Sequence, residues 1–532
     1  MTTTQVIVVG AGPTGLATAG ELARQGVAVT VLDGAAGPAA GSRGKGIQPR
    51  TLELLDRWGV ADRLVSLGRS RLRVMRWTTD DDGEPVGVEE SLTVGRTRTD
   101  ARWDRSLVLP QWRVEEVLRD HLAGFGVPVR WDSRVASLSQ DTAGVRVVLD
   151  DGTELTADYL VGADGGSSTV RHQLGVSFLG ETREDVRLLL GDLVVEGLER
   201  DSWHQWAPFV ALCPLAGTDT FQFQSTEGVD IPGPLTPEVY QQVLDDAGAG
   251  HVRVREVRWS SRWRLNVRMV EQYRVGRVFL AGDAAHVHSP AGGQGMNTGI
   301  GDGINLGWKL AAVLHGAPES LLDSYTAERL PIAAGVLGLS TELLGRGLTR
   351  RGAQGETALQ LDLSYRDGPL AAAPDDGVGC DGAETGDVEA GGPPASGARA
   401  GDVQAGDRMP DPVVRDADGR RIRLTAAWRS ADTGWALVGF GSTPDAPAGV
   451  RAVTVLPPGS AATGADTVVD HLGHVADAIA PRTGELVLVR PDNYVALRTT
   501  DPARVTAYLA GVLPPAPGCG AVDQHANAAV AE

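Results

Sequence analysis

Three glycines between a short apolar run and a helical pattern constrain the fold of this chain more than any other feature. Gly10, Gly12 and Gly15 form GAGPTG directly after the β-branched run at residues 5–9, and a second apolar run ends at Asp33. This order of strand, glycine turn, helix and strand predicts a βαβ unit of Rossmann type. Glycine permits the tight turn and a close approach to a pyrophosphate, and Asp33 can accept hydrogen bonds from ribose hydroxyls. We therefore predict a dinucleotide site here.

Two later segments combine a strand, a glycine turn and a carboxylate in the same way. Asp164 follows one buried strand pattern, and Gly282 with Asp283 follows another, ahead of a loop rich in glycine. A second carboxylate of this kind can hold a ribityl hydroxyl. The amide groups of a helix opened by the later glycines can stabilise negative charge on a reduced flavin ring. All three residues are predicted cofactor contacts, and the pattern indicates a flavin dinucleotide rather than a nicotinamide.

Together, the three segments resemble the GxGxxG, DG and GD fingerprints of the class A flavoprotein monooxygenases, the para-hydroxybenzoate hydroxylase-like family. The resemblance implies FAD as the cofactor, with Asp33 on the adenosine ribose and Asp283 on the ribityl chain. It also implies that Gly295, Met296 and Asn297 lie near the pyrimidine edge of the flavin.

The same resemblance assigns roles to three residues outside the fingerprints. Arg43, in GSRGKG, matches an arginine near the FAD pyrophosphate that also affects nicotinamide binding, and Gln111, in LPQWR, matches a further FAD contact. Pro290, in HSPAGGQG, matches a proline beside the flavin ring, with an ordinary loop proline as the equally weighted alternative. Arg43 and Pro290 are the predicted catalytic contributors. No carboxylate or histidine can be singled out as a base for a phenolic substrate.

The chemistry of this family implies an oxidoreductase that uses NADPH or NADH together with O2. A transiently docked nicotinamide reduces FAD, and a C4a-hydroperoxyflavin then hydroxylates an aromatic ring. The domain organisation is similar to that of hydroxylases of antibiotic biosynthesis, so we expect a polycyclic, polyketide-type substrate. Two alternatives stay open, namely Baeyer–Villiger oxygenation by the same fold and a flavin- or drug-binding protein without turnover.

Periodicity and composition predict an α/β protein with several domains. Residues 1–178 and 276–370 are predicted to form one discontinuous, Rossmann-like FAD-binding domain. Residues 179–275 have longer strands of period two and few helices, which predicts an antiparallel substrate-binding sheet, and 71–108 are candidates to join it. Residues 371–405 are dominated by Ala, Gly, Asp and Pro, which predicts a linker.

The last part of the chain resembles the thioredoxin-like C-terminal domain of phenol hydroxylase and of polyketide aromatic hydroxylases. The resemblance covers residues 406–515, and a tail is predicted at 516–532. Asn493 and Leu497 stand where related sequences commonly have Gly and Trp, so the local turn and packing are expected to differ. Because the domain has no CxxC pair, we expect a structural or dimer-shaping role for it rather than a redox role.

Aromatic residues at two-residue spacing are the candidates for the substrate site. Trp206, Phe221 and Phe223 lie in the predicted antiparallel sheet, where one face could roof the flavin and hold a flat polycyclic substrate. Core packing is the competing explanation for the same residues.

Charge and composition argue against other classes of partner. A net charge of −19 and a pI near 5.0 disfavour nucleic acid and anionic lipid surfaces. No apolar run reaches the roughly 18 residues needed to span a bilayer, and the start of the chain lacks the pattern of a secretory signal, so we expect a cytoplasmic protein. His286 and His288 have no third ligand at suitable spacing, so no metal is expected. A monomer and a homodimer are both compatible with the sequence.

Overall fold

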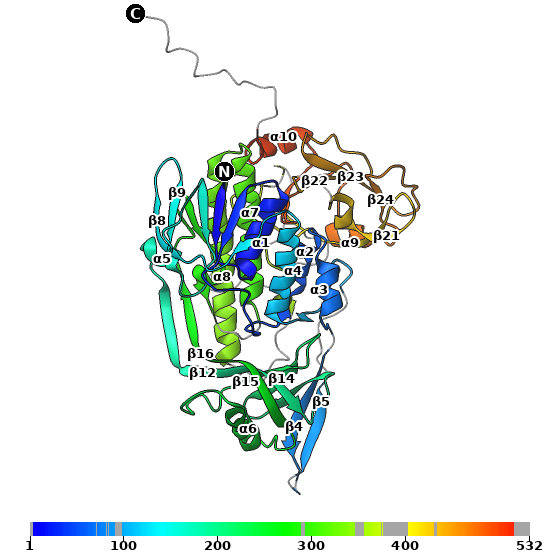
Figure 1. Cartoon of the computed structure of the whole chain (residues 1–532). Helices are drawn as coiled ribbons and strands as arrows, with labels where there is room; N and C mark the ends of the chain where they lie inside the picture. Colours follow the sequence, from blue (N-terminus) through cyan, green and yellow to red (C-terminus); the bar gives the residue numbers. More distant parts are fainter. Residues whose placement is uncertain are drawn as a thin grey trace, which may run out of the picture.

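The computed structural model describes residues 4–70, 72–80, 82, 84–90, 98–288, 293–345, 356–373, 375, 403–429 and 433–514. Sheets of six, eight and seven strands dominate this part of the chain. In Figure 1 they lie at the upper left, at the bottom and at the upper right of the molecule. Most of the predicted linker and tail falls outside the described residues.

The six-stranded sheet carries the predicted dinucleotide motif. Its strands lie in the order β17 (Arg274–Val275), β18 (Val278–Leu280), β11 (Tyr159–Gly162), β1 (Val6–Val9), β2 (Val29–Leu32) and β7 (Val129–Arg130). From β18 to β7 the strands run parallel, and β17 is antiparallel at one edge. The apolar residues of β1 are buried throughout, as expected for a central parallel strand that is covered on both faces. Because the carboxyl ends of parallel strands meet at one edge, the turns after β1, β2, β11 and β18 converge there.

Helix α1 (Pro13–Arg24) packs closely against α7 (Gly295–Leu314), and glycines on α7 make this contact possible. A Cβ atom on Gly303 would lie 2.7 Å from the backbone oxygen of Thr14. A Cβ atom on Gly299 would lie 2.2 Å from the Thr14 hydroxyl oxygen. The absence of these side chains therefore brings the N-terminus of α7 next to the glycine turn that opens α1.

Shorter elements surround this core. They are α2 (Pro49–Asp56), α3 (Ala61–Leu67), α4 (Gln111–Ala123), α5 (Thr169–Gln173), the sheet of β10 (Glu154–Ala157), β9 (Val145–Leu149) and β8 (Val135–Gln140), and the pair β3 (Gly46–Ile47) and β6 (Leu107–Val108). The long helix α8 (Asp323–Gly345) packs against α7. Among the helices in the described ranges, none combines the length and the apolar character needed to cross a bilayer.

The eight-stranded sheet is mostly antiparallel. Its order is β19 (His286–Val287), β16 (Arg253–Met269), β12 (Leu179–Glu196), β15 (Phe221–Ser225), β14 (Val210–Pro214), β13 (Ser202–Trp206), β4 (Arg73–Thr79) and β5 (Pro85–Glu90). The pairing of β13 with β4 is parallel, so residues 73–79 and 85–90 join this sheet from an earlier part of the chain. Helix α6 (Pro237–Asp246) covers one face, at the bottom of Figure 1.

The seven-stranded sheet belongs to the last part of the chain and packs against α7. Its order is β21 (Arg421–Arg423), β20 (Val413–Arg415), β24 (Thr467–Val469), β23 (Val450–Leu456), β22 (Trp435–Phe440), β25 (Leu486–Val489) and β26 (Val495–Thr499), with helices α9 (His474–Ile479) and α10 (Pro502–Ala510). Trp308 of α7 meets Trp435 of β22 edge to face, with ring centroids 5.8 Å apart. Both rings lie in one buried apolar cluster, so this sheet shares a core with the FAD-motif region.

Candidate functional site

The turn after β1 has the shape that a dinucleotide pyrophosphate requires. Gly10 has φ +107°, and a Cβ atom there would lie 2.3 Å from the oxygen of Ala163. A Cβ atom on Gly15 would lie 1.9 Å from the Gly10 oxygen. A Cβ atom on Gly12 would meet no atom within 4 Å, so the turn faces open space. Glycine is required on the protein side of this turn, and the free space on the other side fits a phosphate group.

Asp33 is fixed at the end of β2 by backbone groups from both sides. Its Oδ2 accepts a hydrogen bond from the Ala11 N–H at 2.7 Å, and its Oδ1 accepts one from the Ala35 N–H at 2.9 Å. These bonds hold the carboxylate beside the glycine turn, where the sequence predicts the adenosine ribose.

The segment after β18 is held against α1 and α7. Gly282 has φ +59°, and a Cβ atom there would lie 2.4 Å from the hydroxyl oxygen of Thr14. Its N–H donates to Asp302 Oδ2 at 3.1 Å, and His286 Nε2 is bonded to the same oxygen at 2.8 Å. Asp302, on α7, thus anchors the segment that contains Asp283.

Asp283 is exposed although both its neighbours are buried. Solvent reaches its side chain, but enough protein atoms surround it that desolvation raises the pKa of its carboxyl, against the opposing charges of His286 and Arg43. An accessible carboxylate that is closely surrounded by protein atoms is suited to bind hydroxyl groups.

Arg43 and Gln111 lie at the same site. Gln111 Oε1 accepts from the Gly44 N–H at 3.1 Å, and its Nε2 donates to Glu115 Oε1 at 2.9 Å. Arg43 is exposed, and burial raises the pKa of both the Glu115 and the Asp283 carboxyls while the nearby positive charge of Arg43 opposes this shift. The structure therefore brings these predicted residues together. Glu115 was not among the residues predicted from the sequence, and only its position one helical turn after Gln111 could have indicated it.

The N-terminus of α7 lies against the loop that precedes α2. Asn297 Oδ1 accepts from the Gln48 N–H at 2.8 Å, and Asn297 Nδ2 donates to the oxygens of Gly46 at 2.9 Å and Gly293 at 2.8 Å. Its side chain amide thus ties α7 to this loop. Met296 follows Gly295 at the start of the helix, where the positive end of the helix dipole can stabilise an anionic ring.

The DG segment has a clear structural role. Asp164 accepts from Ser168 Oγ at 2.5 Å and from the Thr169 N–H at 2.7 Å, which caps α5. Arg171 donates to the oxygen of Ala284 at 3.0 Å and joins this segment to the one after β18. A cofactor contact of Asp164 stays a prediction. Pro290, the other predicted residue of this region, lies outside the described residues.

The three aromatic residues predicted to face the substrate lie in the core on the α6 side of the eight-stranded sheet. Trp206, Phe221 and Phe223 are at most 4% exposed and form one apolar cluster with Tyr240 of α6. The rings of Phe223 and Tyr240 meet edge to face with centroids 5.1 Å apart. This placement favours the competing explanation, core packing, because the three side chains share one face of the sheet and point away from the cofactor residues. A contact of these residues with substrate stays a prediction.

The opposite face of the sheet meets the loop that carries Arg43. Asp192 and Cys213 are the cross-strand neighbours of Gln222, so the three share a face. Asp192 Oδ2 accepts from the Ser42 N–H at 2.9 Å, and Gln222 Nε2 donates to the Ser42 oxygen. Lys45 Nζ donates to Gln222 Oε1, so loop 41–46 lies across this face.

Apolar side chains lie on the same face of the sheet as Asp192. We call this group the cofactor-side wall; it consists of Leu188, Leu190, Phe209, Trp259 and Trp263. Gly41 lies against the Trp259 ring, since a Cβ atom on it would come within 2.3 Å. Leu188, Leu190 and Phe209 of this wall are buried and its two tryptophans are partly buried. Asp192 and Gln222 lie beside the wall.

Asp192 is a buried acidic group of this interface with a shifted pKa. It is 4% exposed, and burial raises its pKa to about 6, against the hydrogen bonds from Ser42 and the charge of Lys45. The carboxyl therefore changes protonation state near the pH range in which enzymes work.

Comparison with known proteins gives consistent results for the whole chain. Residues 3–340 match the FAD binding domain family, and residues 406–512 match the HcaD C-terminal domain family. A flavin-dependent monooxygenase of Mycobacteroides abscessus is 39% identical over 96% of this chain and 100% of its own length. The 6-methylpretetramide 4-monooxygenase of Streptomyces rimosus is 40% identical over 68% of this chain and 65% of its own length. The crystal structure of aklavinone-11 hydroxylase with FAD and aklavinone superposes with a TM-score of 0.78 at 28% identity, over 96% of this chain and 99% of that one.

Proposed function

This chain belongs to the FAD-binding-domain family and is a flavin-dependent monooxygenase, and from that premise we propose that it hydroxylates a polycyclic, polyketide-type aromatic substrate with NAD(P)H and O2. The observation that carries the proposal is the placement of loop 41–46, which has the cofactor residues on one side and the cofactor-side wall on the other. A ring system on this wall would lie between the sheet and the cofactor.

The residues of the cofactor site have separable roles in the proposal. Bound FAD supplies the redox chemistry, because it accepts electrons from a nicotinamide and activates O2. Asp33 would bind the adenosine ribose, the amides of the turn at Gly12 would bind the pyrophosphate, and Asp283 would bind the ribityl hydroxyls. The N-terminus of α7 would stabilise negative charge on the flavin ring. Arg43 lies near enough to the Glu115 and Asp283 carboxylates for its charge to oppose the rise of their pKa that burial causes, and it is suited to hold phosphate charge.

The wall and the relatives support this substrate class. Two tryptophans, two leucines and a phenylalanine form an apolar cluster, while Asp192 and Gln222 add polar groups beside it. A flat molecule with oxygen substituents would bury its rings against the apolar residues and form hydrogen bonds from its oxygens to Asp192 and Gln222. The named relatives act on 6-methylpretetramide and bind aklavinone, which supports a substrate of that kind.

The proposal divides the chain into a discontinuous FAD-binding domain, a substrate-binding sheet domain and a thioredoxin-like C-terminal domain. For the last of these, the support is its strand order β23, β22, β25, β26, in which β22 is parallel to β23 and antiparallel to β25. Helix α10 follows β26. Residues 406–512 contain no cysteine, so we propose no redox role for this domain.

Consumption of NADPH by the purified yellow protein tests the function. The rate is measured with and without a panel of polycyclic phenols and quinones, under ¹⁸O2, with products identified by mass and NMR. A substrate-stimulated rate with one labelled oxygen on an aromatic ring is the expected result. A labelled lactone would identify Baeyer–Villiger oxygenation, and tight ligand binding without stimulated oxidation of NADPH or NADH would identify a binding protein.

A further inference from the structure

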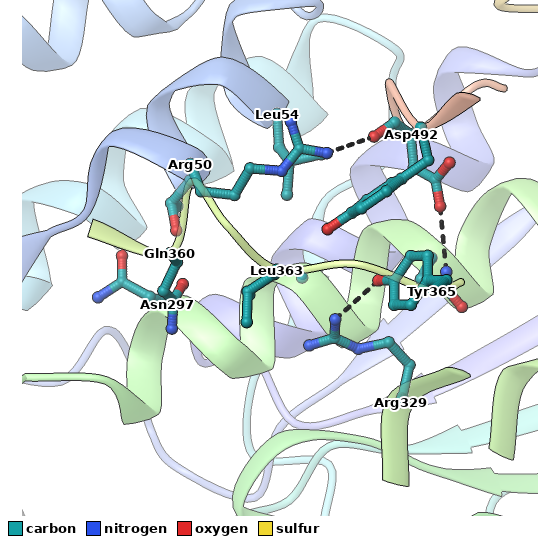
Figure 2. A pocket seen from close by; sticks show the side chains of 12 residues that line it. Arg50, Leu54, Asn297, Arg329, Gln360, Leu363, Tyr365 and Asp492 are labelled. Carbon is teal, nitrogen blue, oxygen red and sulfur yellow. Dashed lines mark hydrogen bonds between the residues drawn. The ribbon is translucent and has the colours of Figure 1, made fainter. Parts of the chain in front are cut away.

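A small cavity lies where the FAD-motif region meets the C-terminal sheet. Its lining includes Arg50 of α2, Asn297 of α7, Arg329 of α8, Tyr365 and Asp492. Figure 2 shows these side chains around the cavity, with the Arg329 guanidinium directed at the Tyr365 hydroxyl. One predicted flavin contact, Asn297, and a residue of the C-terminal domain, Asp492, therefore line the same cavity.

A series of buried contacts leads from the segment after β18 to the C-terminal domain. Its first link joins this segment to α8. Asp302 is fully buried, and both its carboxylate oxygens are used. Its Oδ2 holds the Gly282 N–H and His286, and its Oδ1 accepts from Arg329 Nε at 2.7 Å. Burial opposes ionisation of Asp302, but the charges of Arg329 and His286 outweigh it and hold the pKa of this carboxyl below its usual range. The position of Asp302 thus depends on Arg329.

The second link joins Arg329 to Tyr365. Arg329 donates to the Tyr365 hydroxyl at 2.8 Å and to the Thr298 oxygen at 3.1 Å. Burial raises the pKa of Tyr365 well above its ordinary value, so the hydroxyl stays neutral and can accept this bond. The Tyr365 ring packs on Tyr494, with centroids 4.2 Å apart. Tyr494 belongs to the turn between β25 and β26, so this series of contacts reaches the C-terminal domain.

The third link is the turn itself, residues 490–494. Arg490 binds Glu328 of α8 at 2.6 Å and Asp492 at 2.8 Å. Asp492 Oδ2 accepts from Asn305 Nδ2 at 3.0 Å and from Trp308 Nε1 at 3.2 Å, both on α7. A buried charge without its partner is costly, so these contacts fix the turn relative to both helices.

Asn493 gives this turn its shape. It has φ +58°, in the left-handed region that glycine and asparagine tolerate best. Asparagine therefore permits this turn without a glycine.

We propose that turn 490–494 of the C-terminal domain is a positioning element for FAD. Through Tyr365 and Arg329 it fixes Asp302. Asp302 in turn fixes the segment that presents Asp283 to the cofactor. The inference rests on the proposed contact between Asp283 and FAD and is independent of the substrate.

The test is a double-mutant cycle on FAD affinity in the full chain. Tyr365→Phe deletes only the hydroxyl between Arg329 and the C-terminal domain, and Asp302→Asn weakens the next link. The dissociation constant of FAD is measured by titration of the apoprotein, with flavin fluorescence as the signal. Tyr365→Phe is expected to raise the dissociation constant of FAD about fivefold. The same substitution is expected to have a smaller effect in the Asp302→Asn background.

Tyr508→Phe is the matched control. It deletes a hydroxyl that donates to the Leu370 oxygen at 2.9 Å and lies near the charges of Arg490 and Asp492 in the turn, but it forms no hydrogen bond to Tyr365 or Arg329. It is expected to leave FAD affinity within about twofold of the wild type. Equal losses for both tyrosine variants, or a full effect of Tyr365→Phe in the Asp302→Asn background, would overturn the proposal.

Tyr494→Leu provides a second route if Asp302→Asn does not fold. It keeps the hydroxyl of Tyr365 but removes the ring on which Tyr365 packs. Weaker FAD binding, with a smaller added effect of Tyr365→Phe, is the expected result. Wild-type FAD affinity in Tyr494→Leu would contradict the role of the turn.

Discussion

Asp33 accepts hydrogen bonds from the N–H groups of Ala11 and Ala35 at 2.7 and 2.9 Å. Asp33→Ala removes this support for the turn together with the expected ribose contact. Hydrogen bonds to a charged group contribute about 1.5–3 kcal/mol, so FAD affinity should fall about tenfold to a hundredfold in a titration of apoprotein. Asp151→Ala is the control, because Asp151 accepts from the Thr153 N–H at 2.8 Å in an exposed turn. An equal loss in the control would point to general destabilisation.

Asp192 predicts a specific pH dependence of stability. Its folded-state pKa of about 6 is raised from 3.8, so folding favours the neutral carboxyl. Its contribution to the free energy of unfolding is therefore fully present at low pH and is lost as the pH rises from about 4 through 6. The total loss is at most roughly 3 kcal/mol. Asp192→Asn keeps an acceptor for Ser42 but does not titrate. We therefore expect the wild type to lose stability relative to this variant between about pH 4 and pH 7 in urea denaturation.

The difference between the two proteins is the informative quantity in that experiment. Burial also raises the pKa of Asp411 to about 6, so this group titrates in the same window. Its contribution is the same in wild type and variant and cancels in the difference. A difference that does not change with pH would contradict the environment that we assign to Asp192.

The two faces of the eight-stranded sheet predict different effects of mutation. Trp263→Leu trims the cofactor-side wall, and the KM for a polycyclic substrate should rise about tenfold with FAD affinity unchanged. Phe223→Leu alters the core against α6 and should lower stability by about 1–2 kcal/mol without a change in KM. Steady-state kinetics and urea denaturation of both variants distinguish the faces. A raised KM in Phe223→Leu alone would restore the original aromatic assignment.

At the level of elements, the contact between α1 and α7 positions the cofactor site. Gly303→Ala would place a Cβ atom 2.7 Å from the backbone oxygen of Thr14. We expect a loss of about 1–3 kcal/mol in stability and weaker FAD binding, because α7 must move away from the glycine turn. Gly335→Ala on α8 is the control, since its Cβ would meet nothing within 4 Å. It should leave FAD binding unchanged and add about 0.5–1 kcal/mol of stability. Wild-type behaviour of Gly303→Ala would mean that the helices are not tightly packed.

Element patterns explain what the sequence could and could not predict. The glycine turn, Asp33 and the βαβ unit were predictable because their signals lie within a few residues of one another, and strands β1 and β2 and helix α1 confirm the unit. The substrate-facing side of the sheet was not predictable. In the sequence FQFQS of β15, period two shows that phenylalanine and glutamine occupy opposite faces but not which face meets the cofactor. Only the pairing with loop 41–46 decides this, through contacts far apart in sequence.

At the level of the whole molecule, the buried ions between α8 and the C-terminal domain predict a large cost for one substitution. Arg490→Met leaves Glu328 and Asp492 without their main cation, which should cost about 3–5 kcal/mol in urea denaturation. Arg420→Met is a control in the same domain, because its ion pair with Asp418 is exposed and should contribute less than about 1 kcal/mol. A similar cost for both would show that the interface ions do not hold the domains together.

The sequence could not reveal this network, since Arg490 and Glu328 lie in distant segments that carry no shared motif.

Loop 41–46 has a consequence for how such an enzyme can diversify. Its backbone rests on Asp192, Gln222 and Trp259, while Arg43 on the same loop reaches toward the cofactor residues. A mutation that reshapes the wall for a new ring system therefore also displaces the support of Arg43. Laboratory evolution toward new substrates should accordingly select compensating changes in this loop. Variants in which the wall alone is altered should oxidise NADPH without hydroxylating the new substrate.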